Sequence, residues 1–158
     1  MNPRTDSECL LFNNLTFWVN RLAARMRESM NEAFAEFNVT WPQWMVLNVL
    51  DSGLAGTPAE VADSIGVDRS AVTRLLDRLA DKDFLARIHD DGDRRKVRIE
   101  LTDAGRELMD ALNTKAAEQQ RYFLAQLPPT ELRTLKGNLQ KLLRAGGLET
   151  NKVWRQID

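Results

Sequence analysis

Arginines and hydroxyl groups recur along one face of a short segment, residues 68–81. Its apolar side chains are spaced as on one side of a helix and include Val72, Leu75, Leu76 and Leu79. The opposite face carries Arg69, Ser70, Thr73, Arg74, Asp77, Arg78 and Asp81. Guanidinium and hydroxyl groups near the start of a helix can bond base edges and phosphates, as the recognition helix of a helix-turn-helix does in a major groove. The alternative is the solvated face of an ordinary helical hairpin.

A second group of cations follows in residues 84–101. Residues 84–88 and 96–101 change from a helical period to a period of two, which predicts the two strands of a β-hairpin. The charged turn and the outgoing strand include Asp93, Arg94, Arg95 and Lys96. Arginines on a hairpin next to a recognition helix can contact phosphates or a narrow minor groove, so these residues predict a DNA-binding wing. A solvated surface hairpin remains the alternative.

Local capping signals predict the helices that would position these groups. Thr57 and Glu60 have capping-box spacing, so a helix should begin at Pro58. Gly66 suits a left-handed helix end, and Asp68 can cap the next helix. Two helices joined by so few residues must cross sharply, as in a helix-turn-helix. Thr57, which precedes the first of these two helices, is also a candidate DNA contact.

Longer helices are predicted on both sides of this unit. Apolar residues at three- and four-residue steps predict a helix over residues 11–37, and a capping box at Thr40 and Gln43 predicts another from residue 41 to about 50. A third helix should run from residue 104 to about 127, after Thr102 as its N-cap. Two prolines end it, and Thr130 opens the last helix.

These elements predict a mainly α fold with a small β-hairpin wing, in which a winged helix-turn-helix lobe is joined to a helical dimerisation region. We expect one domain over residues 1–158, with dimerisation helices at 10–38 and 103–145, a DNA-binding lobe at 40–101 and a tail at 146–158. The leucine-rich faces of the outer helices are wider than the small lobe can cover, which predicts a homodimer. Its two recognition helices would read a pseudo-palindromic double-stranded DNA operator, with half-sites about one turn apart.

Composition argues against several other classes. The 158 residues carry 22 basic and 23 acidic side chains, so any attraction to DNA must come from the position of the charges. With one cysteine, Cys9, and one histidine, His89, we expect no zinc site, no catalytic residues and no cofactor, and hence no enzyme. The chain has no secretion signal and no apolar run of the roughly 18 residues that a membrane span needs, so we expect a cytoplasmic protein with no membrane partner.

The sequence resembles the MarR family of bacterial winged-helix transcription regulators over roughly residues 10–145. The segments that carry the resemblance are Val39-Thr40-Trp41-Pro42-Gln43-Trp44, Ala59-Glu60-Val61-Ala62, Val72-Thr73-Arg74-Leu75-Leu76-Asp77-Arg78-Leu79, and Asp93-Arg94-Arg95 before Leu101-Thr102-Asp103-Ala104-Gly105. The resemblance implies that the helix from Asp68 enters the major groove, that Asp93 orients Arg95, and that the wing arginines enter the minor groove.

Two positions depart from the family pattern. Asp83 stands where the family usually has glycine between the recognition helix and the wing, and we expect it to adopt a left-handed conformation at a modest cost in stability. Cys9 lies about two helical turns before the position of the reactive cysteine in peroxide-sensing relatives, so we do not carry redox sensing over to it.

Family members are commonly released from DNA by phenolic or aromatic carboxylate effectors. The candidate ligand residues here are Trp18, Arg21, Trp41 and Trp44, because aromatic walls and one cation suit an aromatic anion. The alternative for the tryptophans is a place in the core. The resemblance thus implies a repressor released by a small effector. A constitutive or activating regulator without an effector and a winged-helix protein-interaction module remain open.

Overall fold

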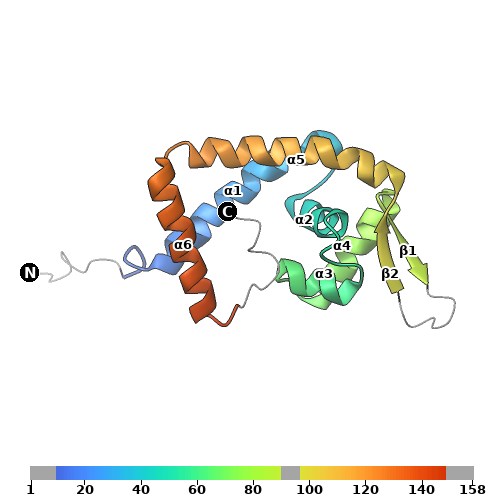
Figure 1. The fold of residues 1–158 in the computed structure, drawn as a ribbon, viewed down its shortest axis with the longest axis horizontal. Coiled ribbons are helices and arrows are strands. Elements are labelled where there is room, and N and C mark those ends of the chain that lie inside the picture. Colours follow the sequence, from blue (N-terminus) through green and yellow to red (C-terminus); the bar gives the residue numbers. More distant parts are fainter. Residues whose placement is uncertain (1–9, 90–96, 149–158) are drawn as a thin grey trace, which may run out of the picture.

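The computed structural model describes residues 10–89 and 97–148 of the chain. This part is mostly helical, with a small antiparallel hairpin at one end (Figure 1). Its elements in chain order are α1 (Leu15–Phe34), the short 3-10 helix η1 (Ala35–Phe37), α2 (Trp41–Asp51), α3 (Pro58–Ile65), α4 (Arg69–Asp81), β1 (Leu85–His89), β2 (Val97–Leu101), α5 (Asp103–Leu124) and α6 (Pro129–Ala145). The predicted fold class, mainly α with a β-hairpin, is confirmed.

The core lies where α2, α3, α4, the hairpin and α5 meet. On α4 the predicted apolar face is buried at Val72, Leu76 and Leu79, while Leu75 is half-buried. The other buried side chains of this cluster include Val46, Leu47, Val61, Leu85, Ile99, Leu101 and Leu112. Removal of this apolar surface from water is the main term that holds α4 and the hairpin together.

The predicted capping residues are in place. Thr57 Oγ1 accepts the Glu60 N–H at 3.3 Å, and Asp68 Oδ1 accepts the Ala71 N–H at 2.9 Å. Gly66 ends α3 in the left-handed region with a φ of 67°, and Thr102 Oγ1 accepts the Gly105 N–H at 3.0 Å. Each bond satisfies a backbone group that the helix end leaves unpaired.

The prediction of one helix over residues 11–37 is wrong at both ends. Asn14 caps α1, with its Oδ1 accepting the Phe17 N–H at 3.3 Å, so the helix begins at Leu15. At the other end the chain tightens into η1 and then turns at Asn38, whose φ is 53°. Periodicity continued through both ends because apolar residues of the adjoining turns happen to lie on the same face.

The boundary between the last two helices also differs from the prediction. α5 ends at Leu124, three residues before Leu127, and α6 begins at Pro129 with Pro128 as its N-cap, so Thr130 lies inside the first turn. A residue before proline is disfavoured in helical geometry, whereas proline itself fits a first helical turn. The proline pair therefore ends α5 early and begins α6 early.

The hairpin is shifted by one residue from the prediction at its start. β1 begins at Leu85 and pairs in antiparallel register with β2 from Leu85↔Leu101 to His89↔Val97. Phe84 lies in the turn that closes the end of α4, where its N–H bonds the Leu79 carbonyl at 3.0 Å. Asp83 has a φ of 59°, which confirms the expected left-handed conformation at this helix end.

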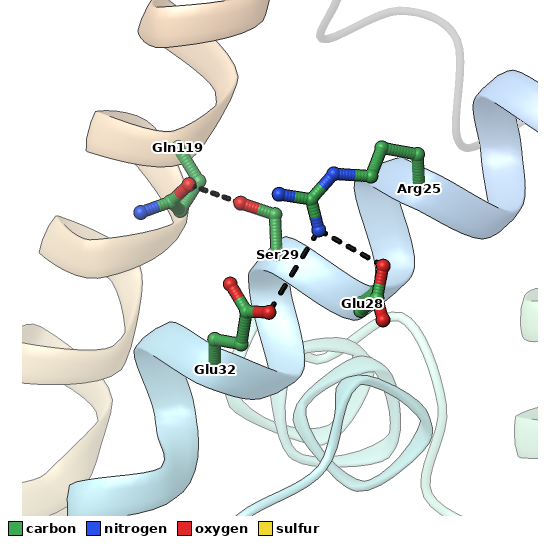
Figure 2. A network of polar contacts seen from close by, with 5 residues as sticks. All are labelled: Arg25, Glu28, Ser29, Glu32 and Gln119. Carbon is green, nitrogen blue, oxygen red and sulfur yellow. Dashed lines mark hydrogen bonds and ion pairs between the residues drawn. The ribbon is translucent and has the colours of Figure 1, made fainter.

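The helices α1 and α5, together called the helical base here, pack against each other and cross obliquely (Figure 1). Figure 2 shows a polar contact at their crossing, where Ser29 Oγ donates to Gln119 Oε1 at 2.6 Å. Next to it Arg25 of α1 lies 2.9 Å from Glu28 and 3.8 Å from Glu32. Ser29 is buried, so its hydroxyl needs this partner, and the pair fixes the register of the two helices.

Candidate nucleic-acid interface

Five of the predicted DNA contacts lie together on the exposed face of α4. They are Arg69, Ser70, Thr73, Arg74 and Arg78. The face is turned to solvent because the opposite side of the helix fills the core with Val72, Leu76 and Leu79. A helix of 13 residues is about 20 Å long and fits a major groove about 12 Å wide. Burial of one face thus presents a broad band of hydrogen-bonding groups on the other.

The two hydroxyl groups on this face already donate within the protein. Ser70 Oγ donates to Asp68 Oδ1 at 2.5 Å, and Thr73 Oγ1 donates to the Arg69 carbonyl at 2.9 Å. A hydroxyl whose hydrogen is used in this way still has acceptor lone pairs. Ser70 and Thr73 are therefore suited to accept from the amino groups of adenine or cytosine in a major groove, while the arginines supply donors.

Asp68 is held as a carboxylate at the start of α4. The hydrogen bonds from the Ser70 hydroxyl and the Ala71 N–H lower the pKa of Asp68 below its usual value of 3.8, against a smaller opposing effect of desolvation. A negative charge at this end also interacts favourably with the helix dipole. The cap that sets the first turn of α4 is therefore ionised at neutral pH.

An ion pair ties α4 to the hairpin. Arg87 Nη2 of β1 lies 2.6 Å from Asp77 Oδ1, and the two side chains are partly exposed. The alternation of strand side chains places Arg87 on the same face of β1 as the buried Leu85, which directs it towards α4. Sequence reasoning missed this pair, and strand alternation was the one local signal that could have found it.

Thr57 follows a residue that is bonded to the middle of β2. The carbonyl of the preceding residue, Gly56, accepts the Ile99 N–H of β2 at 2.8 Å, which attaches the start of α3 to the hairpin. The Thr57 hydroxyl accepts the Glu60 N–H and keeps its own hydrogen for a donor role. Thr57 therefore directly follows a residue that is bonded to the hairpin.

The predicted wing residues are beyond what the structure describes. Asp93, Arg94, Arg95 and Lys96 all fall in residues 90–96, which lie outside the described residues, as does Cys9. Of the strand residues next to this segment, His89 and Arg98 are exposed.

The four candidate ligand residues form two separate groups. At the start of α1, the Trp18 indole donates to the Phe12 carbonyl at 2.7 Å, and Arg21 lies over the Phe17 ring at 5.7 Å. Trp41 and Trp44 stack on each other at 4.9 Å. Asn31, whose Oδ1 accepts the Trp41 N–H, lies thirteen positions after Trp18 on α1, so the two groups are about 20 Å apart along this helix.

The Trp41 and Trp44 pair is joined to the base. The Trp44 indole donates to Asn113 Oδ1 of α5 at 3.1 Å, and the Trp44 ring lies 5.8 Å from the buried Phe34 ring. Trp44 therefore serves in the packing of α2 against α5. Within one chain the four residues do not form a single aromatic cage.

In residues 10–89 and 97–148, no three histidine, cysteine, aspartate or glutamate side chains converge as metal ligands. Within the same ranges, no helix combines the length and the apolar character that crossing a bilayer requires.

Comparisons with known proteins agree with this geometry. A family model described as the MarR family matches residues 37–96. The multiple antibiotic resistance protein MarR of Escherichia coli (strain K12) is 28% identical over 138 residues, which cover 87% of this chain and 94% of that protein. The uncharacterized HTH-type transcriptional regulator YfiV of Bacillus subtilis (strain 168) is 30% identical over 110 residues, which cover 70% of this chain and 69% of that protein.

Solved structures are similar over most of the chain. A mutant of Escherichia coli MarR complexed with operator DNA has a TM-score of 0.79 at 25% identity, covering 88% of this chain and 99% of that one. Bordetella bronchiseptica BpsR, whose DNA binding is described as regulated by 6-hydroxynicotinic acid, has a TM-score of 0.75 at 26% identity, covering 89% of this chain and 97% of that one. The fold described above is therefore that of proteins solved on DNA.

Proposed function

The chain belongs to the MarR family of winged-helix DNA-binding transcriptional regulators, and from this premise we propose that it is a dimeric repressor of a pseudo-palindromic operator. The observation that carries the proposal is the exposed face of α4, where arginines and hydroxyls are held outward by the buried face opposite. We place its activity in the cytoplasm, where a bacterial repressor meets its operator. Repression is the usual mode of the family, and activation is the alternative.

Specific roles follow from the chemistry of each side chain. In this proposal Arg69, Arg74 and Arg78 donate to guanine edges or phosphates, and Ser70 and Thr73 accept from base amino groups. Thr57 bonds a phosphate. The wing residues Asp93, Arg94, Arg95 and Lys96 keep the roles implied by the family, with Asp93 orienting Arg95 and the cations at the minor groove.

The proposed dimer interface consists of apolar side chains that the single chain leaves exposed. On the first half of α1 they are Leu15, Trp18, Val19 and Leu22, and on α6 they are Leu135, Leu139 and Leu142. Two apolar rows of this size on a monomer favour association with a second copy. Residues 10–38 and 103–145 are accordingly proposed as the dimerisation region, residues 40–101 as the DNA-binding lobe and residues 146–158 as the tail.

A small aromatic or phenolic effector is the second part of the proposal. BpsR, a structural neighbour, is described as regulated by an aromatic acid of this kind. Arg21 with the aromatic residues Phe17 and Trp18 offers a cation beside rings, and the Trp41–Trp44 stack offers a flat apolar wall. A regulator without an effector, or a winged-helix module that binds protein, is the alternative.

Selection from a random duplex library tests the proposal. The expected result is enrichment of a two-fold symmetric site, with an affinity whose logarithm falls by about 0.9 per phosphate contact for each unit of log salt. No enriched sequence, or an affinity independent of salt, would overturn DNA recognition. The enriched duplex is then titrated with a panel of aromatic acids, and release by none of them would remove the aromatic effector from the proposal.

A further inference from the structure

A lysine connects the end of α4 to the turn after η1 and to α2. Lys82 is the C-cap of α4, and its Nζ donates to the Asn38 carbonyl at 2.5 Å and to Gln43 Oε1 at 3.1 Å. Both acceptors lie about forty residues earlier in the chain, Asn38 in the turn between η1 and α2 and Gln43 in the first turn of α2. The lysine thus spans from α4 to the turn in which the base joins the DNA-binding lobe.

Its acceptors are held in place independently of Lys82. Gln43 is 3% exposed, and its Oε1 also accepts the Thr40 N–H at 3.1 Å, which starts α2. Asn38 has a left-handed backbone, and its N–H bonds the Ala35 carbonyl at 3.0 Å. Because the acceptors are set by local structure, the ammonium group has a defined position between them.

Opposing electrostatic effects act on the ammonium group of Lys82. The carbonyl end of a helix favours a cation, and a partly buried cation needs hydrogen-bond acceptors. Burial, followed by the repulsion of Arg78, lowers the pKa of Lys82 from 10.5. A side chain kept in a site that disfavours its charge is retained there by its two acceptors.

The other side of the same turn is attached to α5. Thr102 Oγ1 donates to the Asp83 carbonyl at 2.5 Å, and the Thr102 N–H donates to the Phe84 carbonyl at 3.2 Å. Residues 82–84 are therefore held between the start of α5 and the turn before α2. The C-terminal end of α4 is therefore bonded towards α5 through Thr102, and to the turn before α2 and α2 itself through Lys82.

We infer that Lys82 is a positioning residue that sets the angle of α4 on the base, and with it the half-site spacing that the dimer accepts. This inference rests on the proposed function. A change of about 10° at the anchored end moves the far end of a 20 Å helix by about 3 Å, which is close to one base-pair step. The residues that read DNA lie towards that far end, so the anchor controls where they meet the groove.

The test compares operators that differ only in the distance between half-sites. The enriched duplex is used with its own spacing, with one base pair added or removed, and as a single half-site. Wild-type protein is expected to prefer its own spacing. Lys82→Met should reduce that preference by about tenfold, the equivalent of one mismatched base pair, while its affinity for a single half-site stays within about twofold.

Two further variants make the result specific to Lys82. Lys82→Arg keeps a cation with donors and should restore most of the preference. Lys141→Met removes the same charge from an exposed position on α6 and should leave the preference unchanged. If Lys82→Met does not fold, Lys82→Gln makes the same test, because its side chain is shorter and carries no charge.

The outcomes separate this inference from the proposed function. Wild-type protein that binds one half-site as well as two would refute the proposed dimeric recognition. Wild-type protein with a strict spacing preference that Lys82→Met or Lys82→Gln retains would refute the role of Lys82 alone. A Lys82→Arg variant no better than Lys82→Met would refute it too.

Discussion

Arg74 lies in the N-terminal half of α4 on the exposed face, and it is the side chain that we expect to contribute most to sequence discrimination. A bidentate arginine on guanine distinguishes base pairs, whereas a phosphate contact does not. Arg74→Ala should lower discrimination by about 1–3 kcal/mol at one base pair per half-site. The measurement is affinity for the enriched duplex and for its single-base variants.

Arg133→Ala on α6 is the matched control, since Arg133 is exposed and far along the chain from α4. It should leave discrimination unchanged. If Arg74→Ala loses affinity equally for specific and random DNA, Arg74 contacts a phosphate and does not read a base.

Asp68 makes the start of α4 sensitive to acid. Its pKa is lowered below 3.8 in the folded chain, so its stabilising contribution is present above that pH and is lost as the pH falls through the folded pKa. Asp68→Asn keeps an acceptor for the cap without this titration. Thermal unfolding from neutral pH to below pH 3.8 should therefore show a smaller loss of stability in Asp68→Asn than in wild type.

The control for this prediction is Asp63→Asn on α3, which changes the charge equally at an exposed position. Its acid profile should follow that of the wild type. Parallel profiles for wild type and Asp68→Asn would show that the hydrogen bonds from Ser70 and Ala71 do not stabilise the carboxylate.

At the scale of elements, Gly105 determines how closely α5 approaches the end of α4. A Cβ at this position would lie 2.1 Å from the Phe84 carbonyl oxygen, so backbone would have to move. Gly105→Ala should destabilise the fold by about 1–3 kcal/mol or more, the usual cost of overpacking. Urea unfolding followed by circular dichroism measures the change.

Gly137→Ala is an instructive control because it is the same substitution in a helix where a Cβ would meet nothing within 4 Å. Alanine should stabilise this position by about 0.5–1 kcal/mol through its greater helix propensity. If both alanine variants stabilise the protein, the close approach at Gly105 does not exist in solution.

The ends of the helices and strands show which features can be predicted from residues close together in the sequence. Asp68, Thr57 and Thr102 were correctly expected as caps because each acts on an N–H three residues ahead. The end of α1 was placed too late because Asn38, which turns the chain, lies in a stretch with continuing apolar periodicity. The Arg87–Asp77 pair was missed because it depends on how β1 packs against α4.

At the scale of the whole molecule, the association of two copies through α6 can be measured directly. Leu139 lies in the exposed row with Leu135 and Leu142, and a charge there would be buried at an apolar interface. Leu139→Glu should convert the dimer to a monomer in sedimentation equilibrium and weaken binding to the two-half-site operator.

Lys141→Glu is the control, because it places a glutamate on α6 about 200° round the helix axis from Leu139. It should remain a dimer. A Leu139→Glu variant that stays dimeric would place the interface elsewhere, and a wild-type monomer would contradict the proposed dimer itself.

The amino-acid sequence alone was sufficient for the element order, the apolar face of α4 and the candidate residues on its exposed face. These features depend on interactions within a few residues, or on a periodicity that any compact fold must satisfy by burying one face. The contacts that orient α4 join distant parts of the chain, as Lys82 joins Asn38 and Thr102 joins Asp83. Only the tertiary structure could decide them, because such contacts exist only once core packing has fixed the angles between helices.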